Sequence, residues 1–192
     1  MIGMAWATLI MAAACFSSFA IGIRFYFVKP AEKTLPMYLV TEVGVVISLL
    51  HLGLLAHRGV WCQLLDTRAL AGAIALYAGS LILYLWTLRT VIDHRLTFAY
   101  TRDTPKVLID AGPYRYVRHP FYTAYTMCYL AAPAALMAWW LLPTAVFMFL
   151  VYRQSAVMEE RKFAGSELQA AYSDYAGRTG RFLPRLFPSS RR

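Results

Sequence analysis

The chain has 192 residues, of which 59% are hydrophobic and only 15% are charged, whereas soluble domains are about 25% charged. This composition excludes an ordinary soluble domain and indicates a protein of the lipid bilayer. The net charge of +9 does not indicate a nucleic-acid partner, because the basic residues lie between apolar runs and in the tail. Cys15, Cys62 and Cys128 form no C-x-x-C pair, so neither a disulfide framework nor a metal site is expected.

Five apolar runs follow one another, and each is expected to form a membrane helix. A helix needs about 20 residues to cross a bilayer, and the first three runs reach that length. The last two runs are shorter and nearly continuous, so they predict a short helical hairpin. The expected helices cover about 4–27, 36–56, 69–92, 118–137 and 139–164, with a short tail helix at about 166–176. We therefore expect one all-α membrane domain that spans residues 1–192.

The distribution of basic residues predicts the orientation of this domain. With five crossings, all but two of the 19 Lys and Arg residues fall on one side. By the positive-inside rule that side is the cytoplasm. The N-terminus is then expected outside, while the loop at 93–120 and the C-terminal helices form a cytoplasmic cap.

Polar residues gather at the expected cytoplasmic boundary of the membrane. They comprise Arg115, Arg118, His119, Arg153, Glu159, Glu160, Tyr172, Tyr175, Arg178 and Arg181. Unpaired charges at the edge of a bilayer are costly, so these groups should pair with one another or with a charged ligand. Residue types alone leave both a structural ion-pair network and a ligand site open. The roles of two further ionisable residues, Glu42 and His94, also stay open.

The order and spacing of these residues resemble the isoprenylcysteine carboxyl methyltransferase family, which is grouped with phospholipid N-methyltransferases among integral-membrane methyltransferases. The shared pattern is Gly112-x-Tyr114-x-x-x-Arg118-His119-Pro120-x-Tyr122, an apolar hairpin, Glu159-Glu160, Tyr172-x-x-Tyr175-x-x-Arg178 and Phe182-Leu183-Pro184. The resemblance covers roughly residues 89–187, and neither the Arg-His-Pro element nor the Glu-Glu element is specific when taken alone.

The resemblance implies a methyl donor, S-adenosylmethionine, bound beneath the cytoplasmic cap and released as S-adenosylhomocysteine. It implies donor binding by Gly112, Tyr114, His119, Pro120, Tyr122, Glu159 and Glu160. It also implies catalytic roles for Arg118, Arg178 and Glu160. The chain has no G-x-G-x-x-G motif after a strand, so the Rossmann mode of binding this donor is not supported.

The implied methyl acceptor is a lipophilic molecule that enters from the bilayer. The carboxylate of an isoprenylcysteine-like compound is favoured, because Arg118 and Arg178 match the family's arginines and guanidinium groups bind carboxylates bidentately. A phospholipid amine or a small thiol is the alternative and would need a base, either His119 or one glutamate. Two hypotheses without catalysis also remain. The protein could be a membrane scaffold that binds no donor, or its basic residues could bind anionic lipids.

Overall fold

The computed structural model describes residues 2–26, 35–62, 64–92 and 105–185, and these residues confirm the predicted all-helical architecture. The elements are α1 (Ile2–Tyr26), α2 (Leu35–Leu54), η1 (Leu55–Trp61), α3 (Thr67–Val91), η2 (Gly112–Arg115), α4 (Pro120–Leu136), η3 (Trp139–Leu141), α5 (Leu142–Phe163) and α6 (Gln169–Arg178). Within the described ranges there is no strand, and one isolated parallel bridge joins Val117 to Gly180. The His94 position and the first part of the loop expected to form the cap, 93–104, lie outside the described residues.

Four described helical segments are long and apolar enough to cross a membrane, so the expected count of five is not confirmed. These segments are Ile2–Phe25, Val40–Trp61, Thr67–Val91 and Trp139–Phe163. The remaining helix, α4, has 17 residues and is therefore about 26 Å long, slightly less than a bilayer core of about 30 Å. It ends where Met137 adopts a left-handed conformation with φ 48°. The short hairpin therefore places one long helix, α5, beside one shorter helix.

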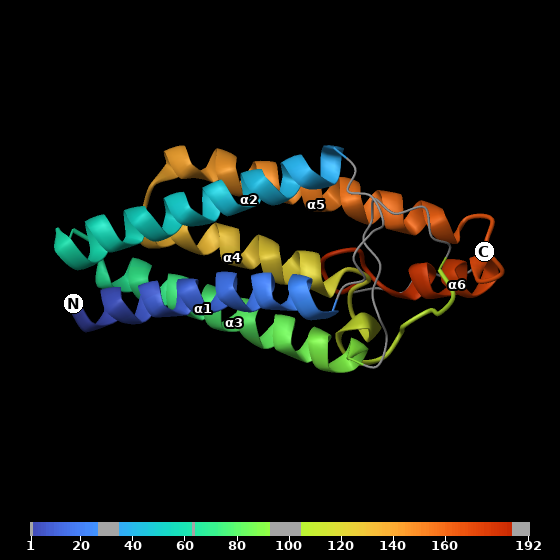
Figure 1. Cartoon of the computed structure of the whole chain (residues 1–192). Helices are drawn as coiled ribbons and strands as arrows, with labels where there is room; N and C mark the ends of the chain where they lie inside the picture. The colour runs from blue at the N-terminus through green and yellow to red at the C-terminus, as the bar shows by residue number, and fades with distance from the viewer. Residues whose placement is uncertain (1, 27–34, 63, 93–104, 186–192) are drawn as a thin grey trace.

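The long helices run side by side, with α4 between the pair α1 and α3 and the pair α2 and α5 (Figure 1). Buried hydroxyls join neighbouring helices where their backbones approach closely. Tyr84 of α3 donates to the carbonyl of Ser18 in α1 at 2.9 Å, and Ser80 of α3 donates to the carbonyl of Ala124 in α4 at 2.7 Å. Small residues permit this approach, which is the usual packing mode of helices in membranes.

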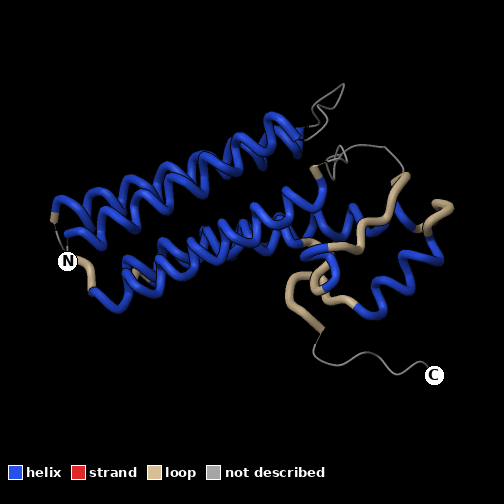
Figure 2. Tube along the Cα trace, turned by 90° about the horizontal axis from the view of Figure 1, so that it is seen from below, coloured by secondary structure: helices blue, strands red, loops and turns tan. Residues whose placement is uncertain are grey.

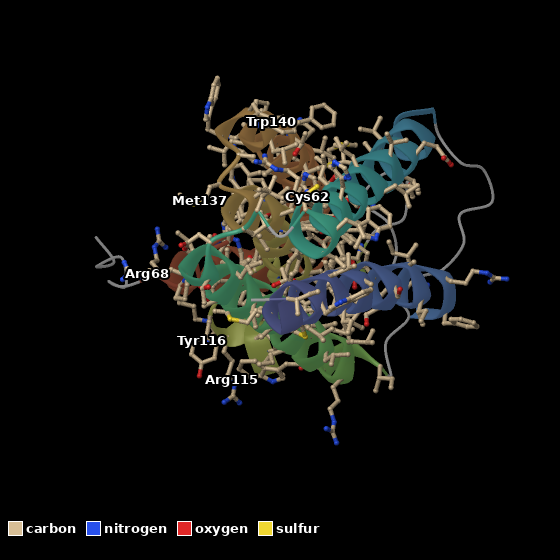
Figure 3. The ribbon with its side chains drawn as sticks, turned by 90° about the vertical axis from the view of Figure 1, so that its left-hand side faces the viewer. Cys62, Arg68, Arg115, Tyr116, Met137 and Trp140 are labelled. Atoms are coloured by element: carbon tan, nitrogen blue, oxygen red, sulfur yellow. The ribbon has the colours of Figure 1, made fainter. Side chains whose placement is uncertain are left out.

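The two ends of the bundle differ in chemistry. The α6 helix and the loops around it gather at one end, and the N-terminus of α1 lies at the other (Figures 1 and 2). The end distant from α6 exposes large apolar side chains, with Trp61 76% and Trp139 80% accessible, and Figure 3 looks onto this end. Tryptophan at a helix end is typical of a membrane interface. Glu42, within the second apolar run, is exposed on the outside of α2.

Candidate functional site

The Arg-His-Pro segment is a short extended link between η2 and α4. Pro120 is the first residue of α4, a position that suits proline because its φ is already helical and no N–H is needed there. His119 precedes it with a non-helical backbone, φ −126° and ψ 64°. The N–H of Arg118 donates to the carbonyl of Gly180 at 2.8 Å, and the N–H of His119 donates to the carbonyl of Arg181 at 3.1 Å. The tail is therefore fastened to the segment that precedes α4.

Gly180 allows the tail to pass alongside the segment that precedes α4. A Cβ atom at this position would lie 1.7 Å from the carbonyl oxygen of Leu183. The chain turns back on itself so closely that only glycine fits without a change in the backbone. The same turn places the side chain of Arg181 next to Glu160 of α5.

The Glu160 carboxylate is the centre of an ion-pair cluster that joins three segments of the chain. Its Oε1 accepts hydrogen bonds from Arg118 Nε at 3.0 Å and Arg181 Nε at 3.0 Å, and it lies 3.2 Å from His119 Nε2. Its Oε2 accepts from Arg181 Nη2 at 2.6 Å. A carboxylate offers about four acceptor positions, so these partners nearly saturate it. The side chain is only 14% exposed, and this geometry is that of a structural clamp.

His119 connects the two neighbouring glutamates. Its Nδ1 lies 3.3 Å from an oxygen of Glu159, while its Nε2 faces Glu160. Both ring nitrogens can donate at once only when the imidazole is protonated. Burial alone would lower the pKa of His119, but hydrogen bonds to Glu159 and Glu160, together with their charges, raise the pKa above its ordinary value. The position between two carboxylates therefore favours the protonated form of His119.

Glu159 is the more accessible of the two carboxylates. Its side chain is 29% exposed, and its Oε1 accepts a hydrogen bond from the Tyr122 hydroxyl at 2.6 Å. The Tyr122 ring stacks on the ring of His119 at 5.6 Å and on the ring of Tyr152 at 5.4 Å. Glu159 also contributes to raising the pKa of the Tyr114 hydroxyl, after the larger effect of burial. A carboxylate with spare acceptor capacity thus sits beside a stack of aromatic rings.

Arg118 reaches beyond this cluster to the end of α6. Its Nη1 donates to the carbonyls of Ala176, at 3.1 Å, and Thr179. The last carbonyls of a helix have no partner within the helix and carry partial negative charge, so a cation there is favourable. Arg118 thereby couples the Glu160 clamp to the position of α6.

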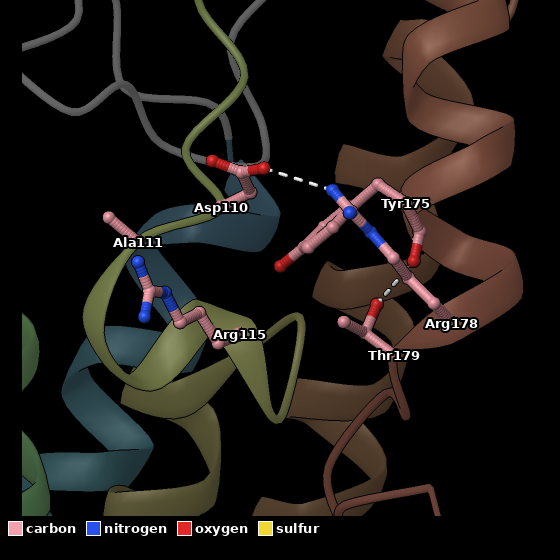
Figure 4. Close-up of a pocket in the computed structure, with 6 residues that line it drawn as sticks. All are labelled: Asp110, Ala111, Arg115, Tyr175, Arg178 and Thr179. Carbon is pink, nitrogen blue, oxygen red and sulfur yellow. Dashed lines mark hydrogen bonds and ion pairs between the residues drawn. The ribbon is translucent and has the colours of Figure 1, made fainter. Parts of the chain in front are cut away.

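The structure places Arg178 at a separate cleft, about 320 Å³ in volume, between η2 and α6. Arg178 Nη2 lies 2.9 Å from Asp110 Oδ2, and these side chains are 62% and 55% exposed respectively. The cleft is lined by Asp110, Ala111, Arg115, Tyr175, Arg178 and Thr179 (Figure 4). Thr179 connects the two places, since it lines the cleft while its carbonyl accepts from Arg118.

Gly112 has a structural reason for its place at the start of η2. Its φ is +55°, and a Cβ atom there would lie 2.2 Å from Thr90 Oγ1 in α3. The next predicted residue, Tyr114, is anchored through its carbonyl, which accepts from the Tyr175 hydroxyl at 2.8 Å. Both positions therefore hold η2 between α3 and α6.

Of the predicted site residues, the structure brings Arg118, His119, Tyr122, Glu159 and Glu160 together, and it leaves Arg178 outside their cluster. Two residues that the structure brings to the cap, Arg181 and Asp110, were not among the predicted site residues. Arg181 lies next to the Phe182-Leu183-Pro184 element of the motif, which is a signal that could have identified it. Asp110 belongs to no motif, and only the fold brings it to Arg178.

Comparison with known proteins identifies the family. A family model described as phospholipid methyltransferase matches residues 68–171, which is more than half of the chain. The match runs from the start of α3 into α6 and includes both the Arg-His-Pro segment and the two glutamates. No match was found among curated proteins or among solved structures. The chain belongs to the phospholipid methyltransferase family, within the group of integral-membrane methyltransferases that also contains the isoprenylcysteine carboxyl methyltransferases.

Proposed function

We propose that this membrane methyltransferase transfers a methyl group from S-adenosylmethionine to a lipophilic acceptor in the bilayer. The observation that carries the proposal is the cluster around Glu159 and Glu160. The fold assembles it from the end of α5, the link before α4 and the tail. It combines an accessible carboxylate, a histidine between two glutamates and aromatic rings at the end of a helical membrane bundle.

Glu159 is the proposed contact to the donor. Its side chain is more exposed than that of Glu160, and its oxygens can accept hydrogen bonds from an ammonium group or from ribose hydroxyls. The faces of the neighbouring rings suit a cation, because an aromatic face carries negative electrostatic potential. Glu160 and Arg118 act as positioning residues in this proposal, since their hydrogen bonds already go to other parts of the cap.

S-adenosylmethionine supplies a methyl group bonded to a positively charged sulfur, and transfer to a nucleophile leaves S-adenosylhomocysteine. The contribution of the chain is to align the acceptor and to exclude water, which in well-oriented models contributes up to roughly 7 to 11 kcal/mol. An amine acceptor must also lose a proton. Glu159 lies at the cluster edge with part of its side chain accessible and is the proposed base.

The preferred acceptor is the amine of a phospholipid, because the matching family is described by phospholipid methylation. The carboxylate of an isoprenylcysteine-like compound is the second candidate. It is favoured by the exposed guanidinium of Arg178, which can bind a carboxylate bidentately. A carboxylate is already ionised at neutral pH and needs no base.

We place the α6 end in the cytoplasm. The basic residues Arg115, Arg118, Arg178 and Arg181 lie around α6, whereas only Arg58 and Arg68 lie in the connection at the opposite end. Positive charge collects on the cytoplasmic side of membrane proteins. The water-soluble donor would then enter from the cytoplasm and the acceptor from the bilayer.

Binding of S-adenosylhomocysteine to the purified full chain, measured by calorimetry, tests the proposal. We expect saturable binding by the wild type and at least tenfold weaker binding by Glu159→Gln. Glu167→Gln is the matched control, because Glu167 is an exposed glutamate of the same cap and should leave the affinity unchanged. A folded wild-type protein that shows no saturable binding would refute the proposal.

A further inference from the structure

The cleft between η2 and α6 is lined by two arginines and one aspartate. Arg115 lies on one side and Arg178 on the other, with the Asp110 carboxylate at the rim between them (Figure 4). Arg178 is oriented by its ion pair to Asp110 and by the ring of Tyr175, whose centroid is 6.0 Å away. Arg115 has no ion-pair partner among the residues that the structure describes. The cleft therefore has a surplus positive charge beside one carboxylate.

This arrangement is complementary to a zwitterion. Two guanidinium groups can bind the oxygens of an anionic group, and guanidinium geometry matches carboxylate and phosphate alike. The Asp110 carboxylate can accept hydrogen bonds from an ammonium group a few bonds away. The present partner of Arg178 is a solvent-exposed acid, and exposed ion pairs are weak, so a ligand can replace it easily.

The Glu159 and Glu160 cluster cannot serve the anionic end of the donor. His119 was expected to bind the donor, but both of its ring nitrogens face glutamates. A carboxylate placed there would adjoin two others of the same charge. Arg118 and Arg181 are engaged by Glu160 as well. The anionic end needs other cations, and Arg115 and Arg178 lie just beyond Thr179.

We infer that the Asp110, Arg115 and Arg178 cleft binds a zwitterionic group, namely the amino-acid end of S-adenosylmethionine. In this arrangement the carboxylate of the donor meets Arg115 and Arg178, and its ammonium meets Asp110. Glu159 is left to the ribose hydroxyls. The inference rests on the proposed function. The phosphoethanolamine head group of a phospholipid has the same chemistry, an ammonium beside an anionic group, and the experiment separates the two sources.

The experiment compares two nucleosides that differ in the amino-acid end. S-adenosylhomocysteine carries that end, while 5′-methylthioadenosine lacks it. Calorimetry on the purified full chain would measure both affinities for the wild type, Arg115→Gln and Asp110→Asn, with Arg161→Gln, a change at an exposed arginine, as the control. We expect each cleft variant to weaken S-adenosylhomocysteine about 10- to 100-fold, the usual effect of losing a hydrogen bond to a charged group. The affinity for 5′-methylthioadenosine should not change.

The other outcomes separate the remaining possibilities. Unchanged affinity for both nucleosides, with a KM for phosphatidylethanolamine raised at least tenfold, would assign the zwitterion site to the lipid head group. An equal loss of affinity for both nucleosides would overturn the inference, because the cleft residues would then affect only the structure of the cap. Unchanged affinities together with an unchanged KM would overturn it too. A wild type that binds neither nucleoside would instead refute the proposed function.

Discussion

Replacing Glu160 with glutamine should loosen the cap locally without unfolding the bundle. The substitution keeps the shape of the side chain and removes the charge that Arg118, Arg181 and His119 share. Arg118 and Glu160 are 12% and 14% exposed, so three cations would lose a largely buried counter-charge. Removing one partner of a buried ion pair destabilises the folded state by about 3 to 5 kcal/mol. Since each 1.4 kcal/mol is a factor of ten, opening of the cap should become roughly 140- to 3,700-fold more frequent.

Hydrogen exchange of backbone amides, measured on the protein in lipid nanodiscs, is the suitable assay. The relevant amides are those of Arg118 and His119, which donate to the carbonyls of Gly180 and Arg181. The control is Asp110→Asn, which breaks an ion pair of the same cap whose partners are 55% and 62% exposed. Such pairs contribute about 0 to 1 kcal/mol. If Glu160→Gln accelerated exchange no more than Asp110→Asn, the clamp interpretation of Glu160 would be wrong.

Three further predictions test the cap and the bundle. The folded-state pKa of His119 is raised, so the contacts of His119 with Glu159 and Glu160 should stabilise the cap fully below about pH 6.5. This stabilisation should weaken as the pH rises through the folded-state pKa. Amide exchange measured against pH should show the weakening, and the His119→Gln variant should lack this pH dependence. Gly112→Ala should lower the melting temperature more than Gly165→Ala, because both have positive φ but only the first also meets a side chain, at 2.2 Å. Gly22→Ala should cost about 1 to 3 kcal/mol by overpacking, since its Cβ would lie 1.6 Å from the Tyr84 hydroxyl, and Tyr84→Phe in the same chain should recover part of that loss.

The helices were predictable because the apolar runs carry their own signal. The residues at which the helices end were harder to predict, because contacts with other parts of the chain help to decide them. The second run was expected to end near residue 56, where His57, Arg58 and Gly59 follow, but η1 continues it to Trp61. Gly59 is buried there, close to Leu65, and this tertiary contact outweighs the polar character of its neighbours.

The cluster of the site was partly predictable, because its motif lies in two recognisable elements. The association of Arg118 and His119 with Glu159 and Glu160 could be anticipated from a hairpin that returns the chain to the same end. The position of Arg178 could not, because it depends on the side of α6 that faces η2. The ion-pair network and the ligand site, which the sequence leaves as alternatives, also coexist: Glu160 belongs to the first, and Glu159 is proposed for the second.

Transfer of a labelled methyl group tests the central claim most directly. Purified full chain in phosphatidylethanolamine vesicles would be incubated with methyl-labelled S-adenosylmethionine, with an isoprenylcysteine offered in a parallel reaction. We expect label in the extracted lipid and a larger yield from the phospholipid than from the isoprenylcysteine. The label should be lost in Glu159→Ala but not in Glu167→Ala. Absence of label from both acceptors, with a protein that is folded and binds S-adenosylhomocysteine, would contradict the central claim.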